Sequence, residues 1–351
     1  MNSSISSSSL ASIQQLSLLG EMFGHFVNDT SASEEMHQDL LALIEIVQDL
    51  HHHNPWFTKS SVTFALDAWS KVLNYEELLK WVEAYALGNS VDKKVGVIMA
   101  GNIPLVGFHD AICVLICGHV LNAKLSSKDD QLMRFVLKYL KKDSVLNDRI
   151  NIVDNMREID ALIATGSDNS ARYFEHYFKN QKKIIRKNRT SVAVIEKDIS
   201  DADLKNLGND VFTHFGLGCR NVTKIYLPKG FDLDRIFGAF YDFRDIVHHN
   251  KYGNNYDYNK AVYLLNNIEL IENGFLLLKE DKSIHSPIGV LYYEYYQSMD
   301  KLELNFKMLR DKIQCIVGET SFADTDFGKS QQPSLTDYAD GVDTMTFLKE
   351  L

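Results

Sequence analysis

The sequence predicts an α/β protein in which a helical N-terminal region precedes two doubly wound units with parallel sheets. Three observations lead to this prediction. About the first ninety residues repeat apolar positions at helical spacing, short apolar runs then alternate with helical stretches from Lys94 to Glu196, and a looser alternation continues to about residue 320. Alternating strands and helices are typical of parallel sheets that are covered by helices.

The N-terminal region is expected to form amphipathic helices. LLALIEIVQDL (40–50) and YEELLKWVEAYAL (75–87) place apolar residues three and four positions apart, with acidic residues between them. His51, His52 and His53 follow the first of these helices. No acidic or cysteine partners stand at ligand spacing, so we expect a solvated loop here rather than a metal site.

The first α/β unit is expected to start at a continuous apolar run, VGVIMA (95–100), which is typical of a strand covered on both faces. No G-x-G-x-x-G fingerprint follows any strand, so the standard dinucleotide phosphate turn is absent. Further strands are expected in NAKLSS (122–127), RINIVDN (149–155), IDALIATGS (159–167) and SVAVIE (191–196), and helices in 104–121, 129–140 and 170–180.

A second α/β unit is expected after Glu196. Its strands are predicted in NVTKIYLP (221–228), ENGFLLLKED (272–281), GVLYYEYY (289–296) and IQCIVG (313–318). Helices are predicted in 201–215, 231–247 and 301–312, and a further helix is predicted to begin at residue 259. The aromatic strand 291–296 is better explained by a position in the sheet than by a pocket. The stretch after residue 320 is polar, and we expect an irregular segment with a short extended end.

Composition excludes several classes of function. The net charge of −10 argues against nucleic acid as a main partner, because phosphate binding needs a basic surface. Four cysteines are too few for a disulfide framework, which favours a reducing cytoplasm. No apolar run is long enough to predict a membrane span, and the Ser-rich start lacks the basic and apolar regions of a signal peptide.

Four short stretches are candidates for chemistry: Gly101-Asn102-Ile103-Pro104, Lys124-Leu125-Ser126-Ser127, Thr165-Gly166-Ser167 and Phe215-Gly216-Leu217-Gly218-Cys219-Arg220. Three of them follow predicted strands, and ligands of doubly wound sheets gather at the carboxyl ends of strands. Each stretch also has a purely structural interpretation, as a turn, a helix cap or a small buried thiol. The glycines beside Cys219 would leave its backbone N–H open to close approach, whereas Cys113 and Cys117 are expected in the core.

Taken in this order, GNIP, KLSS, ATGS and G-x-G-C resemble the aldehyde dehydrogenase superfamily. The chain is most similar to its acyl-CoA reductase branch, the LuxC-type fatty-acid reductases. The stretches GNIPLVGFHDAICVLICGHVLNAKLSSKD (101–129), IIRKNRTSVAVI (184–195) and FGKSQQPSLTDYADGVDTMTFL (327–348) carry the similarity, which covers Lys94 to Leu351.

The resemblance implies a role for each candidate residue. Cys219 would attack a thioester carbonyl and hold the acyl group. The Asn102 amide and the Cys219 backbone N–H would stabilise the oxyanion, and the loss of one such donor typically costs ~3 kcal/mol. Lys124 would contact the adenosine ribose and Ser126 a 2′-phosphate, while Thr165, Gly166 and Ser167 would face the pyrophosphate at a helix N-terminus. NADPH is the expected cofactor, with NADH left open.

Two departures from the superfamily pattern bear on the reaction. Arg186 occupies the position of the glutamate that activates water in aldehyde-oxidising members, and a guanidinium has no free lone pair to act as a base. The second superfamily glutamate falls in SIHSP (283–287), which has no carboxylate. His285 and His214 are the nearest groups that could protonate a leaving group, although a structural role is the simpler expectation for both.

The expected function is therefore NAD(P)H-dependent reduction of an acyl thioester, carried by CoA or an acyl carrier protein, to the aldehyde. A CoA-acylating short-chain aldehyde dehydrogenase, a thioester-forming acyltransferase and a catalytically silent scaffold remain alternatives. The resemblance implies three regions: 1–190 with helices and the nucleotide-binding unit, 191–320 with the cysteine nucleophile, and a C-terminal segment, 321–351, that packs on the cofactor domain or a partner subunit. A homo-oligomer is expected.

Overall fold

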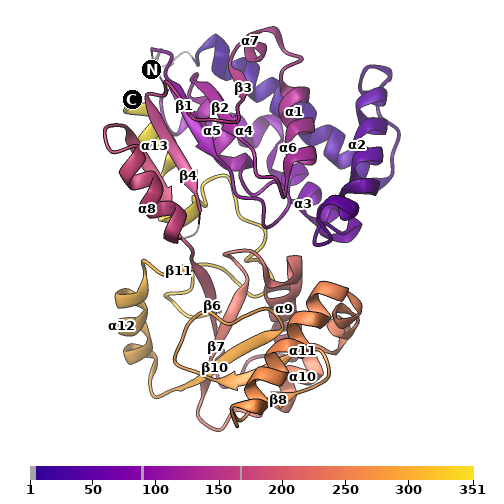
Figure 1. Ribbon diagram of the computed structural model, residues 1–351, viewed down its shortest axis with the longest axis vertical. Coiled ribbons are helices and arrows are strands. Elements are labelled where there is room, and N and C mark those ends of the chain that lie inside the picture. The colour runs from indigo at the N-terminus through magenta and orange to yellow at the C-terminus, as the bar shows by residue number, and fades with distance from the viewer. Residues whose placement is uncertain (1–4, 88–90, 167) are drawn as a thin grey trace. The chain divides into compact units, whose positions relative to one another are not determined.

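The chain folds into two compact units, each with its own sheet (Figure 1). The computed structural model describes residues 5–87, 91–166 and 168–351. Unit 1 comprises Met1–Lys187 and Ser334–Leu351, and unit 2 comprises Asn188–Pro333. The C-terminal residues therefore return to the unit that the first half of the chain builds.

The sheet of unit 1 confirms the predicted doubly wound parallel arrangement. Its five strands run parallel in the order β3-β2-β1-β4-β5. The chain builds outward from β1 to β3 and then returns to the other side of β1, so the strand order reverses between β1 and β4. The strands are β1 (Lys94–Ile98), β2 (Val120–Lys124), β3 (Ile150–Ile152), β4 (Ala161–Thr165) and β5 (Lys182–Arg186).

One face of this sheet packs against helices of the N-terminal region and against the first two crossover helices, where the main hydrophobic core lies. The helices are α1 (Ser7–Asn28), α2 (Glu34–His53), α3 (Lys59–Val72), α4 (Tyr75–Glu83), α5 (Phe108–Ile116), α6 (Asp130–Leu140) and α7 (Ser144–Asn147). Close packing within this layer needs a glycine, because a Cβ at Gly20 of α1 would lie 2.3 Å from the Leu73 carbonyl oxygen. His51–His53 are the exposed last residues of α2 rather than a loop.

The second face of the unit 1 sheet is covered less completely. Helix α8 (Asp168–Tyr177) packs over β4 and β5, while the connection 153–160 from β3 to β4 forms no helix. Met156 and Ile159 of that connection cover Gly96, where a Cβ would lie 2.8 Å from the Met156 sulfur. Over β2 and β3 the second face presents amide side chains in place of apolar ones, because no helix buries it there.

Unit 2 is also α/β, with six strands in the order β11-β6-β7-β10-β9-β8. All neighbours are parallel except β8, which runs antiparallel to β9, so this sheet is mixed. The strands are β6 (Thr190–Val194), β7 (Val222–Pro228), β8 (Ile271–Glu272), β9 (Leu277–Glu280), β10 (Val290–Tyr296) and β11 (Ile313–Val317). The helices are α9 (Asp201–Phe212), η1 (Thr213–Gly216), α10 (Asp234–Ala239), η2 (Tyr241–His248), α11 (Asn250–Leu265) and α12 (Met299–Leu309).

The C-terminal residues of unit 1 end in a helix, so the expected extended end is wrong. This segment contains η3 (Ala339–Gly341) and α13 (Thr344–Lys349), and the Asp343 carboxylate caps α13 by accepting the Thr346 N–H at 2.9 Å. Tyr338 fixes the segment to α4, because its hydroxyl accepts the Trp81 indole N–H at 2.9 Å. Within the described part of the chain, no helix is both long and apolar enough to span a membrane.

Candidate active site

Three of the four candidate stretches come together at the carboxyl edge of the unit 1 sheet. Asn102 follows β1, Lys124 ends β2 with Ser126 two residues later, and Thr165 ends β4. Strand β1 lies between β2 and β4, so the three strand ends are neighbours. The strand order reverses between β1 and β4, which is where doubly wound sheets bind ligands. Ser167 lies outside the described residues.

The loops that follow β1 and β2 touch along their length. A Cβ at Gly101 would lie 2.5 Å from the Ser126 hydroxyl oxygen, so only glycine fits beside this serine. The Met99 N–H donates to the Lys124 carbonyl at 3.0 Å. Asn102 and Ser126 are half-buried and Lys124 is exposed. The edge thus presents an amide, a hydroxyl and a cation close to one another.

Asp129 links the two loops, and the sequence analysis did not identify it. Its carboxylate accepts the Leu105 N–H at 2.8 Å, and its own N–H donates to the Ser126 carbonyl at 3.0 Å. The side chain is 2% exposed, and its other oxygen, Oδ1, has no hydrogen-bond partner among the described residues. Burial raises the pKa of this carboxyl to about 8, so it is largely protonated at neutral pH. An Asp before a helix resembles an N-cap, but this side chain makes no capping bond in α6.

Thr165 and Gly166 lie at the end of β4, beside β5. Thr165 pairs with Arg186 in the sheet register, and the Gly166 N–H donates to the Arg186 carbonyl at 3.3 Å. A Cβ at Gly166 would lie 2.8 Å from the Ser170 side chain, so a larger residue would displace the start of α8. Both residues are half-buried.

Arg186 points into unit 1. In the resemblance to the aldehyde dehydrogenase superfamily, its position corresponds to that of a water-activating glutamate. Arg186 is 2% exposed. Its guanidinium binds the Asp110 carboxylate at 2.7 Å and the Thr344 hydroxyl at 2.8 Å, and it also donates to the Ala339 carbonyl. Arg186 therefore joins β5 to the first turn of α5 and to the C-terminal segment. It is a buried structural cation rather than a group presented to a substrate.

Cys219 belongs to unit 2 and lies in a tight turn before β7, at the amino end of that strand. The Asn221 N–H donates to the Gly218 carbonyl at 3.1 Å, and the Gly218 N–H returns a bond to the Asn221 side-chain oxygen at 2.8 Å. The Cys219 carbonyl accepts the Ser191 hydroxyl at 3.0 Å. Cys219 is half-buried, whereas Cys113, Cys117 and Cys315 are buried. Burial raises the pKa of Cys117 to about 12 and that of Cys315 to about 11.

The chain leading to this turn is strained, and Asn221 holds it. His214, Phe215 and Gly216 have consecutive φ values of 52°, 59° and 79°, so two non-glycine residues adopt the left-handed region. Such residues cost about 1–3 kcal/mol each and often accompany functional sites. The fully buried Asn221 amide donates to the carbonyls of Asp210, Val211 and Thr213 at 3.0, 3.3 and 2.8 Å. The positive φ of Gly216 shows that this glycine is needed for the backbone conformation. Sequence spacing indicated neither this role of Gly216 nor the support that Asn221 gives to the turn.

The two histidines considered as proton donors differ in exposure. His214 is buried, and burial lowers its pKa to about 4, so it is neutral at pH 7. His285 is exposed, and the next residue, Ser286, donates to the Thr223 carbonyl at 2.9 Å near the start of β7. Over the described residues, no group of three or more His, Cys, Asp or Glu side chains could hold a metal ion.

Comparisons with known proteins reveal the fold. No family model and no curated protein matches the sequence. Solved structures do match: aldehyde dehydrogenase 21 from Physcomitrella patens, in complex with the reaction product succinate, has 11% identity and a TM-score of 0.63 over 99% of this chain and 87% of that one. The NAD+ complex of an aldehyde dehydrogenase from Bacillus cereus has 11% identity and a TM-score of 0.57 over 90% and 76%. An aldehyde dehydrogenase from Mycobacterium tuberculosis complexed with NAD+ has 13% identity and a TM-score of 0.54 over 82% and 70%. Identities this low show similarity of the fold alone. This structural similarity shows that the chain has the aldehyde dehydrogenase fold.

Proposed function

We propose that this protein reduces a fatty acyl thioester, carried by CoA or an acyl carrier protein, to the aldehyde with a nicotinamide cofactor. The fold supports redox chemistry at an aldehyde or acyl carbon, since solved structures of this fold carry NAD+. The half-buried thiol of Cys219, on a turn held by Asn221, supports an acyl-enzyme intermediate. No second function is favoured by a specific observation.

The single observation that carries the choice of reduction is the environment of Arg186. In the aldehyde-oxidising members of the superfamily that the chain resembles, this position is occupied by the glutamate that activates water for hydrolysis of the thioacyl enzyme. Here it holds a cation that is fully engaged by Asp110, Thr344 and Ala339. A buried, ion-paired guanidinium neither accepts a proton nor orients water as a base. A thioester on Cys219 would therefore persist long enough to be reduced.

In the proposed reaction, the Cys219 thiolate attacks the thioester carbonyl carbon, the bond from that carbon to the carrier sulfur breaks, and the carrier leaves as a thiolate that takes a proton from water. The Asn102 amide would donate to the oxyanion, and the Asp129–Leu105 bond keeps its loop in place. A bound nicotinamide cofactor would supply a hydride to the acyl carbon. The oxyanion formed by that addition would then collapse as its carbon–sulfur bond breaks, which frees the aldehyde and restores the Cys219 thiolate.

Cofactor binding is assigned in this proposal to the carboxyl edge of the unit 1 sheet. The residues there fit such a group: Gly101 and Gly166 bring backbone close to an edge that carries the Ser126 hydroxyl and the exposed Lys124 ammonium. A cation and a hydroxyl suit a 2′-phosphate, which favours NADPH over NADH. Thr165 and Gly166, with Ser167, are proposed to face the pyrophosphate.

The test begins with the acyl enzyme. The protein is incubated with acyl-CoAs of graded chain length, and its intact mass is measured. We expect one acyl adduct on the wild type and on the matched control Cys315→Ala, and none on Cys219→Ala. NADPH consumption and aldehyde release should follow, and Asn102→Ala should lower kcat by about 10²–10³-fold.

Each alternative gives a different result in this test. An adduct without NADPH or NADH consumption would identify an acyltransferase. Rapid hydrolysis of the adduct would show that a base other than the lost glutamate activates water. The absence of an adduct with every chain length would contradict the proposal and favour the scaffold.

A further inference from the structure

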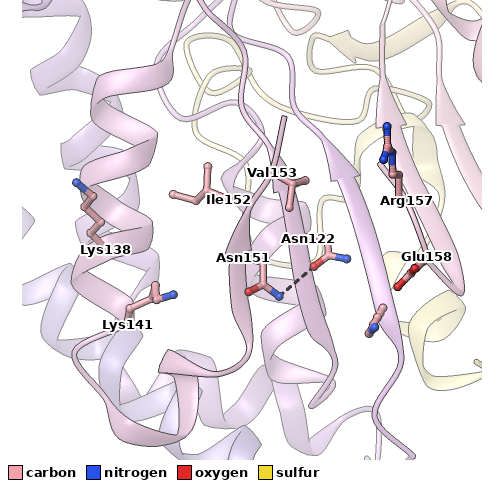
Figure 2. A pocket seen from close by; sticks show the side chains of 9 residues that line it. Asn122, Lys138, Lys141, Asn151, Ile152, Val153, Arg157 and Glu158 are labelled. Carbon is pink, nitrogen blue, oxygen red and sulfur yellow. Dashed lines mark hydrogen bonds between the residues drawn. The ribbon is translucent and has the colours of Figure 1, made fainter. Parts of the chain in front are cut away.

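Unit 1 has a second polar region, distinct from the candidate cofactor edge. A hollow of about 650 Å³ lies beside edge strand β3, between α6 and the connection 153–160 (Figure 2). Lys94 is the first residue of β1 and Arg157 precedes β4 by four residues, whereas Asn122 lies in the middle of β2 and Ile152 ends β3. The hollow thus extends across the second face of the sheet, and none of its lining residues belongs to the candidate stretches of the carboxyl edge.

Positive charge gathers in this hollow, which we call the basic hollow. Lys94, Lys138, Lys141 and Arg157 line it, with Glu158 as its one acidic side chain. Figure 2 shows Lys138 and Lys141 on one side and Arg157 on the other. The chain as a whole carries 47 acidic and 37 basic residues. Four cations with one acid are thus unlike the average surface of such a chain, and they create a local positive potential.

Among the residues that the structure describes, the fold uses only one of these four cations. The Lys141 ammonium donates to the Ile150 carbonyl at 3.0 Å. The side chains of Lys94, Lys138 and Arg157 make no ion pair or hydrogen bond with any described residue. Acids lie near them, Glu158 in the same hollow and three more around Lys138 (Glu45, Asp49 and Asp130), but no described carboxylate forms an ion pair with the three side chains. Their charges are therefore available to a ligand.

The floor of the basic hollow adds a directed donor. The Asn151 amide donates to the Asn122 side-chain oxygen at 3.1 Å, which turns the Asn122 NH2 group away from Asn151 (Figure 2). Asn122 is only 9% exposed, and its NH2 group has no partner among the described residues. Solvent reaches this NH2 group, so an acceptor oxygen in the hollow would take the place of water there.

We propose that the basic hollow binds a phosphorylated small molecule. Its phosphate or diphosphate would lie between Lys138 and Arg157 and accept a hydrogen bond from the Asn122 amide, since guanidinium and ammonium groups with amide donors are the usual partners of phosphate oxygens. Ile152 and Val153 supply an apolar wall for the organic part. The volume is within the range of about 300–1,000 Å³ that is typical of small-molecule sites. This proposal does not depend on the proposed function.

The experiment measures binding to the full chain by isothermal titration calorimetry, with inorganic pyrophosphate and ADP as probes. Asn122→Asp keeps an acceptor for Asn151 but replaces the inward NH2 with a carboxylate oxygen. Lys138→Ala combined with Arg157→Ala removes two unpaired cations from the rim. We expect saturable pyrophosphate binding that both variants weaken ~10-fold or more, and that added salt also weakens. ADP binding that is tighter than pyrophosphate binding, and that both variants weaken, would show that the apolar wall contributes.

Two controls locate the site. Lys229→Ala combined with Lys282→Ala removes two exposed cations of unit 2 that have no partner among the described residues, so it matches the change in charge. Lys124→Ala alters the candidate cofactor edge. Both controls should bind pyrophosphate as the wild type does. The proposal is overturned if pyrophosphate does not bind saturably, if the hollow variants bind it unchanged, or if Lys124→Ala alone abolishes binding.

Discussion

Asn221 supports the turn that carries Cys219, and its replacement by alanine tests how that turn is held. The side chain is fully buried and makes four contacts: one accepted from the Gly218 N–H and three donated to the Asp210, Val211 and Thr213 carbonyls. An amide NH2 has two hydrogens, so these contacts amount to about three hydrogen bonds. At ~1 kcal/mol each, Asn221→Ala should lower the free energy of unfolding by about 3 kcal/mol.

Urea unfolding of the full chain measures the decrease in the free energy of unfolding. Hydrogen exchange shows which residues are affected. Backbone amides in 211–221 should exchange faster in Asn221→Ala, because the strained left-handed residues relax once their support is gone. Asn209→Ala is the matched control: this asparagine, in the same unit, is exposed and its side chain makes no hydrogen bond to a described residue, so the change should stay within about 0.5 kcal/mol. The reasoning is refuted if Asn221→Ala is as stable as the control and its 211–221 amides exchange at the wild-type rate.

Two further predictions concern buried charges in unit 1. Arg186→Met should lower the free energy of unfolding by about 3–5 kcal/mol, because it leaves the buried Asp110 carboxylate without its cation, and adding Asp110→Asn should recover part of the loss; urea unfolding showing less than ~1 kcal/mol would contradict this. For Asp129, the folded state keeps the proton up to a pKa of about 8, whereas the unfolded chain loses it near ~3.9. The group's contribution to stability is therefore complete below the unfolded pKa and declines as pH rises towards the folded one. Asparagine does not titrate in this range. The free energy of unfolding of Asp129→Asn, relative to that of the wild type, should therefore increase by up to ~1.4 kcal/mol per pH unit between pH 5 and 7. Parallel pH profiles of urea unfolding for the two proteins would rule this out.

Strongly apolar segments were predictable from the sequence, and less apolar ones were not. VGVIMA (95–100) overlaps β1, and the predicted helix 104–121 contains α5, although its last two residues, Val120 and Leu121, begin β2. Strand β5 was missed because KKIIR has only two apolar residues, and it exists through its pairing with β4. The residues of helix α13 were expected to be extended, because the stretch after residue 320 is polar. It forms where Met345 and Leu348 pack into the core of unit 1 and Asp343 caps its first turn.

The same distinction applies to the candidate site. Spacing placed GNIP, KLSS and ATGS after strands, and parallel pairing with β1 in the centre brings those strand ends together. The sequence did not indicate Asp129, the Arg186–Asp110 pair or Asn221. Asp129 bonds a residue 24 positions away, and Arg186 and Asp110 are 76 positions apart. Asn221 bonds backbone carbonyls that lie 8 to 11 positions before it, which leaves no recognisable sequence pattern.

By itself, the sequence determined the fold class, the order of most strands and helices, and the strand ends that carry candidate side chains. Only the tertiary structure decided that Arg186 is a buried anchor, that Asp129 keeps a proton, and that unpaired cations converge in the basic hollow. The physical reason is that periodicity and composition report the chain's local preferences. Burial, pairing and desolvation of a charge depend on residues that folding brings together from distant parts of the chain.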